Sequence, residues 1–368
     1  MTAVIINCFE TYEERVELLK RALIKEGYEV CIYASDYLHS VKKERRSPGM
    51  EYILFHAYPY KSNLSFRRLL SHYSLARNIF SFLNKNPEPQ LIWLLLPPNS
   101  CAREAAAYKK NHPGVKLVFD IIDLWPEGMP VEIFKYLPMG NIWRSLRNKN
   151  LPFADCIVIE CDRYRSFLGK LKNKPGIKTV YMSRPLEKLD LTFVPPKEGN
   201  VALCYLGSIN HLIDIKYICK VIRNFKKKTD VELHVIGDGE NRATFLKKAQ
   251  KAGALVKYHG LIYDREEKRK IMNACHYGLN IMKKNICVGF TMKSIDYYEF
   301  GLPNINNLDG DTRWINEKYK TGVNICDGIM DFDNYSCEMR ENARRFFCDY
   351  LTEERFDKKI HEIITGIS

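Results

Sequence analysis

Short apolar runs without polar alternation recur along this chain, and most of them are followed by an amphipathic helical pattern. A strand that lacks a polar face must be buried on both sides, as the strands of a helix-covered parallel sheet are. The pattern therefore predicts an α/β protein built from doubly wound parallel sheets. The predicted strands are 3–6, 29–34, 91–96, 116–122 and 156–160, followed by 201–206, 232–236, 256–259 and 277–281.

Helical patterns separate these runs. Apolar side chains recur at spacings of three and four over 16–23, and further helices are predicted at 102–111, 217–228, 241–252 and 265–274. A chain of 368 residues is long enough for two domains, and the proline-containing stretch Ser183–Asn200 is the predicted linker. We expect Rossmann-like domains over 1–185 and 186–350, and an amphipathic C-terminal helix over 351–368 that packs back on the first domain.

Ligands of open parallel sheets bind beyond the carboxyl ends of the strands, so two facing sheets place the chemistry in a cleft between domains. Glycine there lets backbone amides approach a ligand, and the following helix N-terminus favours a phosphate. A glycine at this position also serves as a plain turn, so a single such loop does not indicate a phosphate site, whereas several in one domain do. Three predicted strands of the second half end in this way, at Gly207-Ser208, Gly237-Asp238-Gly239 and His259-Gly260.

The segment from Val288 to Pro303 gives the strongest local signal. Its Gly289 permits a tight loop, and Thr291 is a predicted helix cap. Lys293 falls in the first helical turn, where a cation opposes the helix dipole, so it is better placed to hold a diphosphate than to stabilise the helix. Asp296 follows one turn later on the same face; a surface ion pair between the two is the alternative.

Taken in order, these motifs resemble those of bacterial GT-B glycosyltransferases, in particular the family 4-like branch of capsule, exopolysaccharide and O-antigen assembly. The likeness covers nearly the whole chain and includes Asp123-Leu124-Trp125-Pro126-Glu127 and Ala154–Val158 in the first half. The resemblance implies two Rossmann-like domains facing across a cleft. It also implies a metal-independent, retaining hexosyltransferase without a cofactor, which moves a sugar from a UDP- or GDP-type donor to an acceptor hydroxyl.

The resemblance assigns the nucleotide ribose to Asp296, at the position of the family's second glutamate. Val288 stands where the family has its first glutamate, and Ser208 to His211 replace the family's basic pair. The diphosphate then needs another cation, for which Lys293 is the first choice and Lys283 and Lys284 come next. The predicted donor site consists of Gly207, Ser208, Gly237, Asp238, Gly239, His259, Gly260, Lys283, Gly289, Phe290, Thr291, Lys293 and Asp296.

Asp123 and Glu127 are the predicted catalytic residues of the first domain. Asp123 follows a strand, so we expect its carboxylate to point into the cleft, as a base or an orienting group near the acceptor hydroxyl. Glu127 lies in the same loop, and Asn7–Glu10 is a further acceptor-side candidate. A buried carboxylate that only caps its loop is the alternative for Asp123.

The charge of the chain is uneven. Lys and Arg number 57 against 44 Asp and Glu, and residues 1–190 hold 29 basic and 20 acidic residues. A basic half attracts nucleic acid, a phospholipid surface or a phosphorylated substrate, and no recognised nucleic-acid motif is present. With the resemblance, we expect a glycan or polyprenyl-diphosphate-linked acceptor and a cytoplasmic protein, peripheral on the inner face of the plasma membrane.

Other patterns narrow the function further. The twelve cysteines include no CxxC, so we expect free, mostly buried thiols in a reducing compartment. No cysteine and histidine spacing predicts zinc, and Asp309-Gly310-Asp311 is interpreted as a turn. Neither an export signal nor a membrane span is predicted. Two alternatives stay open: a nucleotide-sugar epimerase on the same scaffold, and a non-catalytic protein that binds anionic surfaces or nucleic acid.

Overall fold

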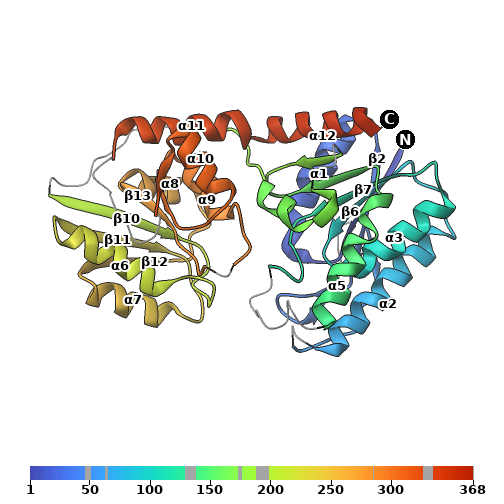
Figure 1. Cartoon of the computed structure of the whole chain (residues 1–368), viewed down its shortest axis with the longest axis horizontal. Coiled ribbons are helices and arrows are strands. Elements are labelled where there is room, and N and C mark those ends of the chain that lie inside the picture. The colour runs from blue at the N-terminus through green and yellow to red at the C-terminus, as the bar shows by residue number, and fades with distance from the viewer. Residues whose placement is uncertain are drawn as a thin grey trace. The chain divides into compact units, whose positions relative to one another are not determined.

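The structure is a computed structural model of the chain, and it divides into two compact units. Unit 1 comprises Met1–Met182 and Glu353–Ser368, and unit 2 comprises Ser183–Thr352. Each unit is a parallel sheet with helices on both faces, which confirms the predicted α/β class (Figure 1). The described residues are 1–45, 51–62, 65–128, 138–172, 176–187, 199–284, 286–325 and 335–367, so most of the predicted linker lies outside them.

The sheet of unit 1 has the strand order β5-β2-β1-β6-β7-β8-β9, and all neighbouring strands are parallel. Every residue of β6 is buried, as expected for an apolar run without polar alternation. A small antiparallel hairpin of β3 (Tyr37–Leu38) and β4 (Lys43–Glu44) follows β2. The sheet strands are β1 (Thr2–Asn7), β2 (Glu29–Ser35), β5 (Tyr52–Phe55), β6 (Leu91–Leu96), β7 (Lys116–Ile121), β8 (Cys156–Ile159) and β9 (Ile177–Thr179).

Helices cover both faces of this sheet (Figure 1). One layer contains α1 (Glu13–Lys25) and α12 (Glu353–Ile367). The other contains α2 (Phe66–Leu83), α3 (Asn99–Asn111) and α5 (Pro138–Asn148). The C-terminal helix α12 buries an apolar stripe and forms ion pairs with α1, Arg21–Glu353 at 2.7 Å and Lys25–Asp357 at 2.5 Å. This confirms that it packs on the first domain. Short 3-10 helices lie at Glu10–Tyr12, Leu151–Phe153, Asp162–Phe167 and Gly169–Leu171.

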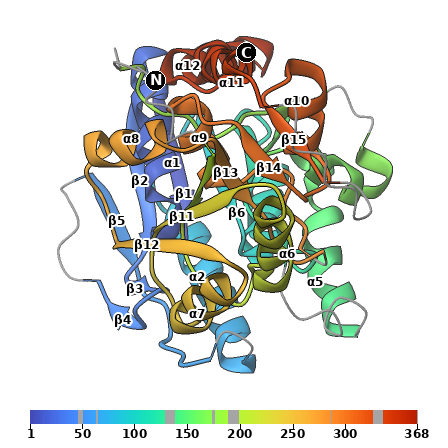
Figure 2. The same ribbon diagram turned by 90° about the vertical axis from the view of Figure 1, so that its left-hand side faces the viewer.

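Unit 2 has a parallel sheet in the order β12-β11-β10-β13-β14-β15. In Figure 2, α6 and α7 lie on one side of these strands and α8, α9 and α11 on the other. Each face has its own apolar core. The strands are β10 (Asn200–Leu206), β11 (Asp230–Ile236), β12 (Ala254–Gly260), β13 (Tyr277–Asn280), β14 (Asn304–Asn306) and β15 (Gly322–Asn324). The helices are α6 (Ile215–Lys226), α7 (Arg242–Lys251), α8 (Arg265–Asn273), α9 (Met292–Glu299), α10 (Asp311–Tyr319) and α11 (Cys337–Tyr350).

All the predicted strands are present, but the long helix α2 was not among the expected elements. Its first half buries Arg68, Ser71 and His72 on the face that turns toward the protein. Polar residues on the inner face interrupt the apolar periodicity by which a helix is recognised in a sequence. This helix therefore carries buried polar groups that periodicity alone does not reveal.

Two further findings concern both units, within the residues that the structure describes. The eleven cysteines within the described residues are free, and most of them are buried. Among the described helices, none combines the length and the apolar character that a membrane crossing needs.

Candidate functional site

The candidate site of unit 2 lies where the order of its strands reverses. Strand β10 lies between β11 and β13, so the chain leaves β10 toward one side of the sheet and returns on the other. Because all strands are parallel, the loops that follow β10 and β13 meet at one edge. A reversal of this kind is where open α/β sheets bind ligands. The second of these loops leads into α9, the helix that carries Lys293 and Asp296.

Lys293 lies against the end of β10. Its Nζ is 4.3 Å from the centre of the Tyr205 ring. A Cβ added to Gly207 would lie 3.7 Å from the Cε of Lys293, which is van der Waals contact, so the lysine lies directly beside this glycine. The structure thus brings together two residues that the sequence separates by 86 positions and that were both predicted in the donor site.

The surroundings of Lys293 affect its charge. Burial lowers the pKa of Lys293 to about 8, because the ammonium loses its hydration. The aromatic face of Tyr205 compensates in part through a cation–π contact. A diphosphate bound beside Lys293 would place negative charge next to the ammonium and compensate for the lost hydration. A buried ammonium of this kind therefore suits the binding of an anion.

A ladder of asparagines fixes the start of α9. Thr291 caps the helix by accepting a hydrogen bond from the Ser294 amide, and its hydroxyl donates to Asn280 Oδ1 at 3.0 Å. Asn280 donates to Asn306 at 3.0 Å, and Asn306 donates to Asn324 at 3.1 Å. Since these three asparagines end β13, β14 and β15, the ladder ties the first turn of α9 to the edge of the sheet.

The glycine loops contribute shape more than amide donors. The amides of Gly207 and Gly237 donate to Ile236 O and Gly260 O at 2.9 and 2.7 Å, and the Gly239 amide donates to Asp238 Oδ1 at 2.7 Å. Gly237 has φ +135°, and a Cβ there would lie 2.1 Å from the carbonyl oxygen of Gly207. These three predicted donor amides are therefore engaged within the protein, and the glycines allow two loops to pack closely.

Asp296 lies one turn beyond Lys293 and is partly buried. Its Oδ1 is 3.8 Å from the Nε of Arg184, a residue that no sequence motif had pointed to. Glu299, one turn further, is buried and hydrogen-bonded to Arg265. Burial raises the pKa of Glu299 to about 7, with Arg265 opposing and Asp296 adding to the rise. The structure therefore adds a second carboxylate and two arginines to this face of α9.

Other predicted donor residues have partners elsewhere in unit 2. Asp238 pairs with Arg242 at 3.0 Å, and His259 is 3.1 Å from His234 in a stacked pair. Phe290 is buried against Tyr298. The predicted residues Ser208, Gly289 and Lys283 lie in the loops themselves. The Ser208 carbonyl accepts a hydrogen bond from the Tyr205 hydroxyl, and the Gly289 carbonyl accepts one from the Thr312 hydroxyl. The Lys283 side chain is exposed, and its amide donates to Leu212 O.

In unit 1, Asp123 follows β7 as predicted. Its Oδ2 accepts a hydrogen bond from Trp125 Nε1 at 2.7 Å, and a Cβ on Gly128 would lie 2.9 Å from its Oδ1. Burial raises the pKa of Asp123, while the Trp125 hydrogen bond and the charge of Arg68 act against the rise. A carboxylate with a raised pKa is a stronger base than an exposed one, as a residue near an acceptor hydroxyl should be.

Glu127 is held differently from Asp123. Its carboxylate is buried and accepts hydrogen bonds from Arg147 at 2.9 and 3.0 Å and from Arg144 at 2.8 Å. Although burial opposes ionisation, these two arginines lower the pKa of Glu127. A carboxylate fixed in a double ion pair is a poor proton carrier. The geometry favours a role in anchoring the Asp123 loop to α5 over the catalytic role predicted for it.

The remaining candidates have structural surroundings. Asn7 accepts from the Phe9 amide at 3.2 Å, and Glu10 accepts from the amides of His39 and Ser40. Asp309 pairs with Arg313 at 2.7 Å, and Gly310 precedes α10. Within the part of the chain that the structure describes, no group of three His, Cys, Asp or Glu residues is arranged to hold a metal ion.

Solved structures share this two-unit architecture. Sucrose-phosphate synthase from Thermosynechococcus elongatus matches with a TM-score of 0.69 and 13% identity, over 100% of this chain and 99% of that one. HepE of Anabaena, solved in complex with UDP, matches with a TM-score of 0.68 and 10% identity over 100% of both chains. The lipopolysaccharide outer core galactosyltransferase WaaB matches with a TM-score of 0.66 and 13% identity, over 100% of this chain and 99% of that one.

These likenesses show the fold: the chain has the GT-B fold that the sequence resemblance implied. No protein-family model matches the sequence, and no curated protein does.

Proposed function

We propose that this chain is a glycosyltransferase that transfers a sugar from a nucleotide-sugar donor to an acceptor hydroxyl. The observation that carries the proposal is the placement of Lys293 beside Gly207, where the strand order of unit 2 reverses. The fold supports it, since HepE of Anabaena was solved with UDP and with UDP-glucose. That this chain also uses a nucleotide-sugar as its donor is part of our proposal.

In this proposal, unit 2 holds the donor. The Lys293 ammonium and the N-terminus of α9 face the diphosphate, since a helix N-terminus carries partial positive charge. Asp296, on the same face one turn on, accepts the ribose hydroxyls. Negative charge grows on the diphosphate as the sugar leaves, so a fixed ammonium beside it stabilises the transition state without a metal ion.

Unit 1 holds the acceptor. Asp123 orients the acceptor hydroxyl or receives its proton, and the Trp125 indole fixes the direction of its carboxylate. We propose retention of the anomeric configuration, in line with the family resemblance. In a retaining enzyme of this fold, loss of Asp123 weakens acceptor use more than it weakens donor binding.

The test of the donor site is the substitution Lys293→Met, which keeps the length of the side chain and removes its charge. We expect the dissociation constant for a nucleoside diphosphate, measured by calorimetry across UDP and GDP, to rise roughly 10- to 100-fold, as for the loss of a charged hydrogen bond. Lys247→Met, at an exposed position of α7, is the control. Equal affinity in all three proteins would place the nucleotide elsewhere.

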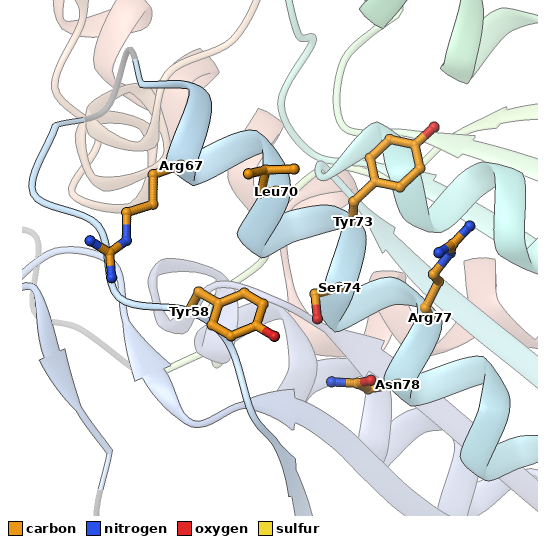
Figure 3. A pocket seen from close by; sticks show the side chains of 7 residues that line it. All are labelled: Tyr58, Arg67, Leu70, Tyr73, Ser74, Arg77 and Asn78. Atoms are coloured by element: carbon orange, nitrogen blue, oxygen red, sulfur yellow. The ribbon is translucent and has the colours of Figure 1, made fainter.

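We further propose that the acceptor is a glycan or a lipid-linked glycan of surface polysaccharide synthesis, used at an anionic membrane. A groove of about 500 Å³ on unit 1 supports this, lined by the outer face of α2 and by Tyr58 (Figure 3). Leu70 and Tyr58 are half exposed beside Arg67 and Arg77. Apolar side chains flanked by arginines match an anionic lipid surface, at about 1 kcal/mol per cation.

Vesicle sedimentation tests the membrane part separately. We expect Leu70→Glu to lower retention on vesicles that contain phosphatidylglycerol, and neither protein to bind phosphatidylcholine alone. Ile24→Glu is the matched control, because Ile24 is similarly exposed on α1, in the other helical layer of unit 1. Unchanged retention of Leu70→Glu would show that this groove does not face the membrane. That result would not bear on the proposed donor site in unit 2.

A further inference from the structure

Basic side chains and aromatic rings gather at the carboxyl edge of the unit 1 sheet. They come from segments that follow four strands: Phe9 after β1, the hairpin after β2, Tyr60 and α2 after β5, and Trp125 after β7. Since the four strands are parallel, these segments meet at one edge. We call this group the basic–aromatic cluster: His39, Lys42, Arg68 and His72 with Phe9, Tyr60 and Trp125.

The partly exposed side of the cluster is formed by His39 and Lys42. The Lys42 Nζ is 3.4 Å from His39 Nδ1 and 4.9 Å from the centre of the Tyr60 ring. The same His39 nitrogen is 2.6 Å from the Tyr60 hydroxyl. Both side chains are only partly buried, so a ligand can reach them from solvent.

The inner side of the cluster is formed by Arg68 and His72, which are 3% and 4% exposed. The Arg68 guanidinium lies 4.3 Å from the Trp125 ring centre, and His72 stacks on the same indole at 6.1 Å. Neither ring nitrogen of His72 has a hydrogen-bond partner among the described residues. A buried polar side chain without partners costs stability, so its retention calls for an explanation such as a ligand.

The cluster has little negative charge of its own. Glu10 is engaged with the backbone amides of the His39 loop, and Asp123 is bound by the Trp125 indole. Burial first, and then the neighbouring cations, lower the pKa of His39 to about 4 and lower that of Lys42. Burial also lowers the pKa of Arg68, and burial with Arg68, His39 and Lys42 lowers that of His72.

We propose that the basic–aromatic cluster binds a phosphate group of the acceptor, an inference that rests on the proposed function. The Trp125 ring connects the two parts of this site, since it contacts Arg68 on its face and donates to Asp123 at its edge. The phosphate lies at the cations and the reacting hydroxyl at Asp123, with the buried Trp125 indole between the two groups. The acceptor is therefore a phosphorylated sugar, either free or lipid-linked.

Histidine signals provide a local test. In protein labelled with ¹⁵N-histidine, we expect inorganic phosphate to shift the ring signals of His39 and His72, assigned through His39→Asn and His72→Phe. Lys42→Gln, at a partly exposed position, should weaken phosphate binding about tenfold, as for a charge-assisted hydrogen bond. Lys85→Gln, at an exposed site just past the end of α2, should not. If phosphate shifts neither histidine, or Lys42→Gln binds it equally well, the proposal is wrong.

Nucleotide titrations separate this inference from the function on which it rests. One outcome is that UDP and GDP bind in a Lys293-dependent way while phosphate does not shift the ring signals of His39 and His72. The proposed donor site would then be supported and the proposed phosphate site would be wrong. If the histidines respond but no nucleotide binds, the cluster is an anion site but not an acceptor site, and the inference is overturned.

The source of the phosphate is settled by two probes. Glycerol 3-phosphate represents a soluble acceptor, and vesicles with phosphatidic acid represent a lipid-linked one. A soluble source predicts that glycerol 3-phosphate competes with inorganic phosphate at the histidines. A lipid source predicts that Lys42→Gln lowers retention on phosphatidic acid vesicles more than Lys85→Gln does. If neither probe engages the cluster, a phosphorylated acceptor is excluded.

Discussion

The two units share one architecture but stabilise the carboxyl edges of their sheets differently. Unit 1 uses buried ion pairs: Arg15 binds Asp120 through two hydrogen bonds of 2.9 Å, and Arg147 binds Glu127. Around the switch point of unit 2, the polar links are neutral asparagine side chains. The asparagine ladder adds no charge beside Lys293 in the first turn of α9, whereas the unit 1 edge fixes its loops with internal charges and adds aromatic rings.

The largest expected effect concerns the buried charges of unit 1. Arg15→Met leaves Asp120 buried without its cation, so we expect unit 1 to lose about 3–5 kcal/mol of unfolding free energy. Urea unfolding followed by hydrogen exchange in unit 1 measures this. Arg21→Met, which breaks the exposed pair with Glu353, should cost less than about 1 kcal/mol. Similar losses in the two variants would contradict the contrast.

A glycine substitution tests the close packing of unit 2. Gly237→Ala places a methyl group against the Gly207 carbonyl at a positive φ, so we expect a loss of roughly 2–4 kcal/mol in unit 2. Gly199→Ala also has a positive φ but meets nothing within 4 Å, and should cost about 1 kcal/mol. Thermal unfolding of both variants checks the difference, and equal costs would refute a packing role for Gly237.

The next effect concerns Asp296. Asp296→Asn keeps the shape of the side chain and removes its charge, so donor affinity should fall by about 1–3 kcal/mol through loss of a charge-assisted hydrogen bond. Calorimetry with the best-binding nucleotide measures this, and Glu240→Gln, at an exposed position, is the control. A change in acceptor use at unaltered donor affinity would argue against the ribose assignment.

The smallest effect is a pH dependence. Because burial lowers the pKa of Lys293 to about 8, the ammonium is charged below that pH and loses its proton above it. Nucleotide affinity should therefore fall by up to about tenfold between roughly pH 7 and pH 9, equivalent to about 1.4 kcal/mol. Lys293→Arg stays charged throughout this range, so its affinity should be flat. A wild-type profile equally flat would mean that Lys293 is not the diphosphate cation.

The predicted placement of Lys293 and Asp296 on one helix agrees with the structure, because local spacing controls it. Lys293 and Asp296 are three residues apart on one helix, so their shared face follows from the helical repeat. The hydrogen-bond partners of the glycine amides could not be predicted in the same way. Whether an amide faces a ligand or a neighbouring loop depends on which strand ends lie side by side, and the sequence does not state this order.

The sequence by itself determined the α/β class, nine of the strands in the two parallel sheets and the helix that carries Lys293, because hydrophobic period and turn residues act over short stretches of chain. Only the tertiary structure decided the partners: the arginines of Glu127, the loop beside Gly237, and the assembly of Arg68 and His72 with Trp125. These contacts join residues far apart in the chain. They form because folding brings parallel strand ends to one edge, and no local pattern encodes which side chains meet there.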